Sequence, residues 1–282
     1  MTDPAFRTDL YRGTARVYDQ FRPPYPDRLI ADIAARTGAD GTGRLLDLAC
    51  GTGQIAFALS ACFAEIWAVD QEPGMIEVAS EKAARSGDAT RFQLLTSAVE
   101  ELAAPAGHFD LVAIGNAFHR LPRATVARGV LGWLRPGGFL ALLWGGSPWF
   151  GEAPWQHALT ATMDRWQHRP DAEDRIPAGY AGARDARPDA EVLTEAGFEI
   201  VGRYAFTVKR DWTADQIAGN VSSTSILSQQ ALGEHAAEFD ADLRRALCAS
   251  QPDGLFLQET ELVYDLARRP ADPASSTTLQ QT

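Results

Sequence analysis

The pattern of apolar and polar positions predicts alternating strands and helices over the first half of the chain. Residues 45–49 form an apolar run broken only by Asp47, which is typical of a strand covered on both faces. A glycine turn leads into a second apolar stretch, residues 55–64, which we predict as a helix. Residues 66–70 then predict the next strand. This strand, turn, helix and strand are typical of an open α/β sheet that binds a nucleoside.

The turn after the first strand has the residues that a close approach to a ligand requires. Gly51 and Gly53 lack a Cβ, so the backbone turns tightly there and leaves room for a bound group. The first amides of the following helix point toward whatever lies over the turn. Asp70 ends the second strand, at the edge of the sheet where a carboxylate accepts hydrogen bonds from the hydroxyls of a ribose. The sequence therefore predicts a nucleoside site at this edge.

The same alternation continues along the chain. Residues 92–95 predict a third strand, residues 110–116 a fourth, and the Pro-Gly-Gly turn within residues 134–146 leads into a fifth. Two long alternating stretches, residues 196–210 and 255–269, predict an antiparallel pair that closes the sheet.

Two classes of cofactor share this architecture. The letters GTGQIA satisfy the loose G-x-G-x-x-G/A pattern, and Asp70 lies 19 residues after Gly51, so a nicotinamide or flavin dinucleotide is a rival. However, a dinucleotide turn usually follows directly on an apolar strand, whereas Asp47 stands four residues before Gly51. The segment DLACGTG resembles motif I of the class I S-adenosylmethionine (SAM) dependent methyltransferases, of the type that acts on small molecules.

The resemblance covers about residues 11–268. It implies a Rossmann-like α/β fold: a seven-stranded, mostly parallel sheet with an antiparallel last strand, helices on both faces and a helical cap formed by insertions. The domain organisation that we expect is a lid helix (1–30), a SAM-binding core (31–146), a cap insertion (147–189), the C-terminal part of the core sheet (190–270) with a helical insertion (213–250), and a disordered tail (271–282).

The resemblance also implies where SAM binds. In the family the motif I acid positions the amino-acid part of the cofactor, the glycine turn accommodates its methionine and ribose, and a side chain like Met75 lies against the adenine. Tyr18, in a V-Y-D-x-F segment, would close over the sulfonium, although residues 11–26 also read as an ordinary packed helix. The expected cofactor-binding residues are Tyr18, Arg22, Tyr25, Asp47, Ala49, Gly51, Gly53, Asp70, Gln71, Met75, Ser97, Ala98, Val99 and Asn116.

His119 and Tyr18 are the candidates for a catalytic role. His119 follows the fourth strand, and its unperturbed pKa of about 6.5 suits proton acceptance at neutral pH. The alternative is a histidine that lines the pocket and takes no proton. Trp144, Trp149 and Phe150 are expected to line the pocket of a largely apolar acceptor, or else to join the cap to the core. No spacing of ligand residues suggests a metal.

The composition of the chain excludes some classes of binding partner. A chain of 282 residues, 45% of them hydrophobic, can bury one sizeable core with an appended cap. A net charge of −11 argues against a nucleic-acid substrate, because phosphate binding relies on clustered lysine and arginine. The N-terminus lacks the pattern of a signal peptide, no apolar run approaches the ~20 residues that cross a bilayer, and three cysteines without pairing spacing fit a reducing cytoplasm.

The expected function is therefore methyl transfer from SAM to a small, largely apolar acceptor, in secondary or specialised metabolism. A methyltransferase-like protein that binds SAM but catalyses another reaction, such as a cyclisation, is the first alternative. An NAD-dependent oxidoreductase is the second, although residues 115–135 contain no lysine for a Tyr-x-x-x-Lys pair. The sequence leaves the acceptor atom (O, N or C) and the oligomeric state open.

Overall fold

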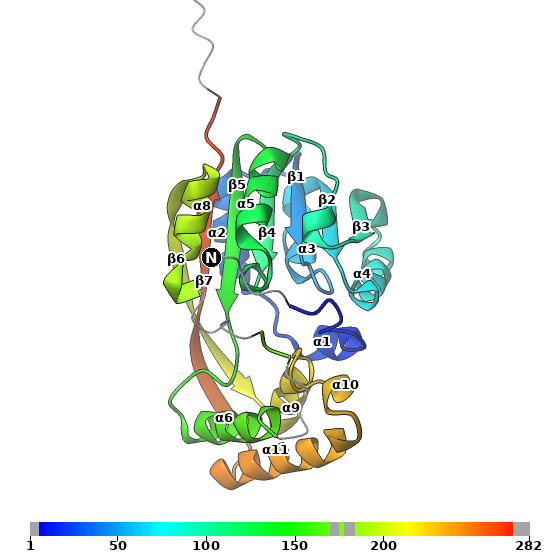
Figure 1. The fold of residues 1–282 in the computed structure, drawn as a ribbon, viewed down its shortest axis with the longest axis vertical. Coiled ribbons are helices and arrows are strands. Elements are labelled where there is room, and N and C mark those ends of the chain that lie inside the picture. The colour runs from blue at the N-terminus through cyan, green and yellow to red at the C-terminus, as the bar shows by residue number, and fades with distance from the viewer. Residues whose placement is uncertain (1–5, 170–174, 178–183, 273–282) are drawn as a thin grey trace, which may run out of the picture.

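One mixed β-sheet organises the molecule. The computed structural model describes residues 6–169, 175–177 and 184–272, and seven strands of this part form a sheet in the order β3-β2-β1-β4-β5-β7-β6 (Figure 1). All neighbouring pairs from β3 to β5 are parallel, whereas β7 runs antiparallel to both β5 and β6. The strands are β1 (Gly43–Leu48), β2 (Phe63–Asp70), β3 (Phe92–Thr96), β4 (Phe109–Gly115), β5 (Leu134–Gly145), β6 (Glu199–Trp212) and β7 (Phe256–Arg268). The predicted fold, with its antiparallel last strand, is confirmed.

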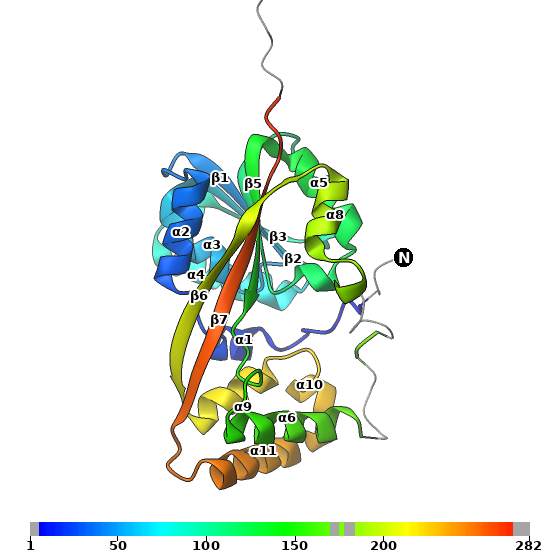
Figure 2. The same cartoon turned by 90° about the vertical axis from the view of Figure 1, so that its left-hand side faces the viewer.

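Helices cover both faces of this sheet (Figure 2). One face carries α2 (Asp27–Thr37), α3 (Gln54–Ala58) and α4 (Pro73–Ser86), and the other carries α5 (Arg123–Trp133) and α8 (Asp189–Ala196). Successive side chains of a strand point to opposite faces, so Leu45 packs in the first layer and Leu46 in the second. Short 3₁₀ turns complete the connections: η1 (Ser60–Cys62), η2 (Ala89–Arg91), η3 (Val99–Glu101), η4 (Phe118–Arg120) and η5 (Gly233–His235).

A helical cap lies beyond the carboxyl edge of the sheet. It consists of α6 (Pro154–Gln167), α9 (Ala214–Ser222), α10 (Gln229–Leu232) and α11 (Ala236–Ser250), and β6 and β7 extend past the other strands to reach it (Figure 2). The cap has an apolar core of its own, in which Trp212 and Phe256 from these two strands join residues such as Trp155 and Leu243. The hairpin therefore ties the cap to the sheet through shared packing.

The N-terminal segment lies between the sheet and the cap (Figure 1). Its helix, α1 (Ala15–Phe21), contacts α4 of the core and α9 of the cap. It begins four residues later than the predicted stretch, because residues 11–14 form a turn in which the Thr14 hydroxyl donates to the Tyr11 carbonyl at 2.7 Å. The predicted disorder of the tail falls mainly on residues 273–282, which lie outside the described part of the chain.

We expect the cap core to contribute strongly to stability. Leu243 is fully buried among the cap helices, so Leu243→Ala should lower the free energy of unfolding by about 2–5 kcal/mol through lost burial and a residual cavity. Cys248→Ala, on the exposed face of the same helix, is the matched control and should change it by less than about 0.5 kcal/mol. Urea denaturation measures both, and equal effects of the two changes would contradict this packing.

Candidate cofactor and acceptor site

A cavity of about 320 Å³ opens at the carboxyl ends of the central strands. Its floor is formed by residues that directly follow or end β1, β2 and β4, and its roof by residues of the N-terminal segment. Eight of the residues expected to bind SAM line it: Tyr18, Ala49, Gly51, Asp70, Gln71, Met75, Val99 and Asn116.

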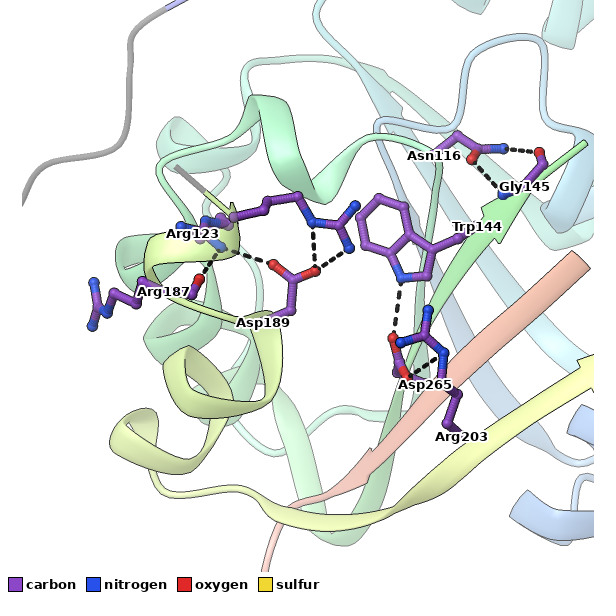
Figure 3. A network of polar contacts seen from close by, with 9 residues as sticks. Asn116, Arg123, Trp144, Gly145, Arg187, Asp189, Arg203 and Asp265 are labelled. Carbon is purple, nitrogen blue, oxygen red and sulfur yellow. Dashed lines mark hydrogen bonds and ion pairs between the residues drawn. The ribbon is translucent and has the colours of Figure 1, made fainter. Parts of the chain in front are cut away.

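Two residues of the cavity floor have a backbone conformation that side chains rarely adopt. Ala49 follows β1 with φ 51° and Asn116 follows β4 with φ 50°. Asn116 is held there by the main chain of Gly145, whose N–H donates to the side-chain Oδ1 at 3.1 Å and whose carbonyl accepts from Nδ2 at 3.4 Å (Figure 3). Such conformations cost about 1–3 kcal/mol each and cluster where a backbone must fit a ligand.

Asp70 connects the two strands that frame the cavity. Its Oδ2 accepts from the Gly51 N–H at 2.8 Å, and its Oδ1 accepts from the Glu72 N–H at 2.9 Å. Burial raises the pKa of this carboxyl, and the two backbone donors oppose that rise. An ionised carboxylate has about four acceptor positions, so Asp70 retains the capacity to accept the two hydroxyls of a ribose.

The side of α1 that faces the core covers the glycine turn. A methyl group added at Gly51 would come within 3.5 Å of a ring carbon of Tyr18, so this ring lies directly over the turn. Met75, which is 2% exposed, packs with Ala15 at the start of α1, and Tyr11 and Tyr18 pack against this pair. Burial raises the pKa of the Tyr18 hydroxyl, so it stays protonated and serves as a hydrogen-bond donor.

Asp47 lies beneath the cavity floor and does not line it. Its Oδ2 accepts from the Ala56 N–H at 2.9 Å and so fixes the start of α3, while no donor in the described part of the chain reaches its Oδ1. The residue is 1% exposed, and desolvation raises the pKa of its carboxyl to about 8.

Arg22 and Tyr25 lie close to the cavity but outside its wall. The Arg22 Nε donates to the Ser223 hydroxyl at 2.7 Å, and its guanidinium carbon lies 5.0 Å from the centre of the Tyr18 ring. Tyr25 lies under Gly115, where an added methyl group would come within 2.6 Å of its hydroxyl.

Three further residues expected at the cofactor lie in the loops around the floor. Gly53 caps the start of α3 with φ 81°. Ser97 and Ala98 connect β3 to η3, and the Ser97 N–H donates to the Asp70 carbonyl at 3.0 Å. These residues shape the loops and do not line the cavity.

His119 also lies outside the cavity wall. Its Nε2 accepts from the Arg120 Nε at 3.3 Å, and its ring centre lies 5.5 Å from that of Trp144. Burial, followed by the charges of Arg120 and Arg184, lowers the pKa of His119 to about 3. An imidazole with this pKa is a weak base at neutral pH, so its environment does not suit the general base that the sequence suggested.

The three aromatic residues expected around the acceptor lie elsewhere. Trp144 faces the α5 and α8 layer, where its Nε1 donates to Asp265 at 3.2 Å and the Arg184 guanidinium carbon lies 4.0 Å from its ring centre (Figure 3). Trp149 packs against the cap core, and Phe150 is 69% exposed. None of the three lines the cavity. The alternation of side chains along β5 directs Trp144 to the α5 and α8 layer, and the cap core holds Trp149.

The wall of the cavity also contains residues that the sequence analysis did not nominate. They are Phe6, Arg7, Thr8, Leu10, Tyr11, Glu100, Gly115, Ala117, Arg120, Leu121 and Pro122. Two signals could have found some of them: Tyr11 lies seven residues before Tyr18, and Arg120 is adjacent to His119. Among the described residues there is no cluster of His, Cys, Asp or Glu that could hold a metal ion. No helix in the described ranges is long and apolar enough to cross a membrane.

Comparisons with known proteins identify a methyltransferase domain in the chain. Residues 45–138 match the family model described as a methyltransferase domain. The chain is 33% identical to methyltransferase-like protein 27 of Homo sapiens over 172 residues, which is 58% of this chain and 66% of that protein. It is 32% identical to the ubiquinone biosynthesis O-methyltransferase of Xanthomonas axonopodis pv. citri over 39% of this chain and 46% of that one. The chain thus spans less than two thirds of each of these two relatives.

Solved structures show the same fold at low sequence identity. The [4+2]-cyclase SpnF has a TM-score of 0.55 at 20% identity, covering 96% of this chain and 98% of that one. The YcgJ protein of Bacillus subtilis has a TM-score of 0.54 at 15% identity, covering 88% of this chain and all of that one. The chain has the Rossmann-like fold of these structures, with a cavity at the carboxyl ends of its central strands. Residues 45–138 therefore form a methyltransferase domain of the SAM-dependent class.

The raised pKa of Asp47 predicts that stability falls as pH rises. The carboxyl has a pKa of about 8 in the folded protein and of about 3.8 in the unfolded chain, so between these pH values the folded state binds one proton more. Each unit by which the pH rises in this range therefore lowers the contribution of Asp47 to the free energy of unfolding by up to about 1.4 kcal/mol. Asp47→Asn retains an acceptor for Ala56 but cannot ionise, so its stability relative to the native chain should increase from about pH 5 to 7.

Urea denaturation over this pH range measures the difference. Asp211→Asn, which removes an exposed carboxylate from β6, is the control. Its free energy of unfolding should depend on pH in the same way as that of the native chain. Parallel curves for the native chain and Asp47→Asn would show that Asp47 titrates normally.

Proposed function

We propose that this protein transfers a methyl group from SAM to a small molecule held in the cavity. One observation carries the proposal: a single cavity brings together the glycine turn, the acid after β2 and Met75 beneath a roof of N-terminal aromatic side chains. Its volume of about 320 Å³ falls within the range of small-molecule sites, roughly 300–1,000 Å³.

The wall of the cavity divides into two parts by chemistry. The cofactor part contains Asp70 and Gln71, which offer acceptors and donors to a ribose, and Met75 and Val99, which offer apolar contact to a flat base. The acceptor part, formed by the N-terminal segment and the loop after η4, is mainly apolar and consists of Phe6, Leu10, Tyr11, Leu121 and Pro122. We place the acceptor against this second part.

Methyl transfer from SAM requires the protein mainly to bind and orient the two reactants. SAM supplies a methyl group on a positively charged sulfur, which is already activated for displacement by a nucleophile. The chain contributes by holding the acceptor close to that group and by excluding water, which can supply much of the acceleration. Because the low pKa of His119 makes it a weak base and its side chain lies outside the wall, we assign no proton transfer to it. The acceptor atom should then be nucleophilic at neutral pH without help from this histidine.

Analysis of the products tests the proposal directly. The purified protein, incubated with SAM and fractions of small-molecule extract, should release S-adenosylhomocysteine (SAH) in a one-to-one ratio with a product one methyl group heavier than its acceptor. Mass spectrometry measures both. Conversion of an acceptor without release of SAH would contradict methyl transfer and favour a non-methylating reaction such as a cyclisation.

The role of Asp70 gives a prediction for cofactor binding. Asp70→Asn removes the charge that would accept the ribose hydroxyls, so the affinity for SAH should fall by about 1.5–3 kcal/mol, the range for hydrogen bonds to charged groups. Asp253→Asn, in the exposed loop after α11, should leave it unchanged. Calorimetry measures both affinities and should detect no saturable binding of NAD. Unchanged SAH affinity in a folded Asp70→Asn protein would remove the basis for the ribose assignment.

A further inference from the structure

The cavity wall contains an arginine for which the described part of the chain provides no counter-charge. Arg120 ends η4 and lies in the acceptor part of the wall. The other arginine of the wall, Arg7, pairs with Asp9 at 3.0 Å, whereas no carboxylate among the described residues pairs with Arg120. A cation of the cavity wall without a carboxylate partner in the described ranges is a candidate for binding an anionic ligand.

The guanidinium of Arg120 is nevertheless held in a defined orientation. Its Nε donates to His119 Nε2 at 3.3 Å, and one N–H of its NH1 group donates to the hydroxyl of Ser225 at 3.1 Å. Ser225 is 3% exposed, and its carbonyl accepts from Arg175 at 2.7 Å, so this anchor is fixed in turn. A guanidinium has five N–H donors, so three donors of Arg120 remain for a ligand.

Apolar side chains surround this charge. The guanidinium carbon lies 5.7 Å from the ring centre of Phe6 and 5.2 Å from that of Tyr11. Both rings line the cavity, together with Leu121 and Pro122, which follow Arg120 in the chain. Aromatic rings beside a half-buried cation exclude water and strengthen its interaction with an anion. The arrangement suits a ligand with an apolar body and an anionic end.

We propose that Arg120 binds the carboxylate of the methyl acceptor, so that the acceptor is an apolar carboxylic acid. Arginine is well matched to this group, because its planar donors can form two parallel hydrogen bonds to a carboxylate. The methionine carboxylate of the cofactor can accept the same two hydrogen bonds. We assign Arg120 to the acceptor because it contacts Phe6 and Tyr11 of the roof, whereas Arg22 stacks on the tyrosine that covers the glycine turn. This inference rests on the proposed function.

Matched pairs of acids and amides test it without knowledge of the natural acceptor. The probes are phenylacetate and cinnamate, each compared with its amide, added to the protein saturated with SAH. Calorimetry or ligand-observed NMR should show saturable binding of the acids and at least about tenfold weaker binding of the amides. Arg120→Gln should reduce the affinity for the acids by about tenfold or more, and Arg120→Lys, which keeps the charge but loses the planar donors, should reduce it less.

Arg128→Gln is the matched control, because it makes the same change of charge at an exposed position of α5. It should preserve the binding of both the acids and SAH. Equal affinity for acids and amides, no binding of the acids to the native protein with SAH, or unchanged acid binding in Arg120→Gln would each overturn the proposal. The acid and amide comparison on the native chain requires no variant, so it decides the question even if Arg120→Gln does not fold.

A second pair of ligands separates the two possible sources of the carboxylate. SAH carries the methionine carboxylate, and 5′-methylthioadenosine lacks it. If Arg120→Gln weakens SAH binding about tenfold but leaves 5′-methylthioadenosine unaffected, the carboxylate belongs to the cofactor and the acceptor assignment is wrong. Failure of the native chain to bind SAH at all would instead contradict the proposed function.

Discussion

The carboxylate of Asp70 is the interaction on which the geometry of the site depends. It ends β2, yet it accepts the N–H of Gly51, which belongs to the turn after β1. Its second oxygen accepts the N–H of Glu72 at the start of α4. One side chain thus fixes the two loops that form the floor of the cavity. Since each oxygen keeps further acceptor capacity, the same group that orders the floor can bind the ligand above it.

A second carboxylate stabilises this floor from below, at a cost in free energy. Asp47 fixes the N-terminus of α3 through the Ala56 N–H, but it does so in a fully buried position that raises its pKa to about 8. A neutral acid can accept that hydrogen bond without an uncompensated buried charge, which is why the stability of the fold is coupled to pH at this position. Both acids lie at the same edge of the sheet, but Asp70 orders the loops and lines the cavity, whereas Asp47 fixes the start of α3.

The sequence predicted the sheet better than the cavity, for a physical reason. The strands follow from alternation and glycine turns, which are local signals, whereas the seven-stranded sheet with its antiparallel last strand was implied by the family resemblance. The floor residues Ala49, Gly51, Asp70 and Asn116 follow from their places at strand ends, and the structure brings them together. The roof depends on how the N-terminal segment and the cap pack against the core, which no local pattern specifies. Trp144 illustrates the limit: it was expected to line the acceptor pocket, but the direction of its side chain places it in the α5 and α8 layer.

The roof of the cavity is held by an apolar cluster on its core side and by polar contacts on its cap side. The cap and the two layers of the core each have an apolar cluster, whose opening would expose buried hydrocarbon to water. At the cavity, by contrast, the loop after α9 is joined to the N-terminal segment by polar contacts: Arg22 donates to Ser223, and Arg175 donates to the carbonyls of Ser225 and Leu10. Water can replace such partners at a small net cost, because a typical internal hydrogen bond contributes only about 0.5–1.5 kcal/mol. The N-terminal segment is therefore joined to the loop after α9 by contacts that water can replace, whereas it packs on the core through the apolar cluster of Ala15, Met75 and Val78.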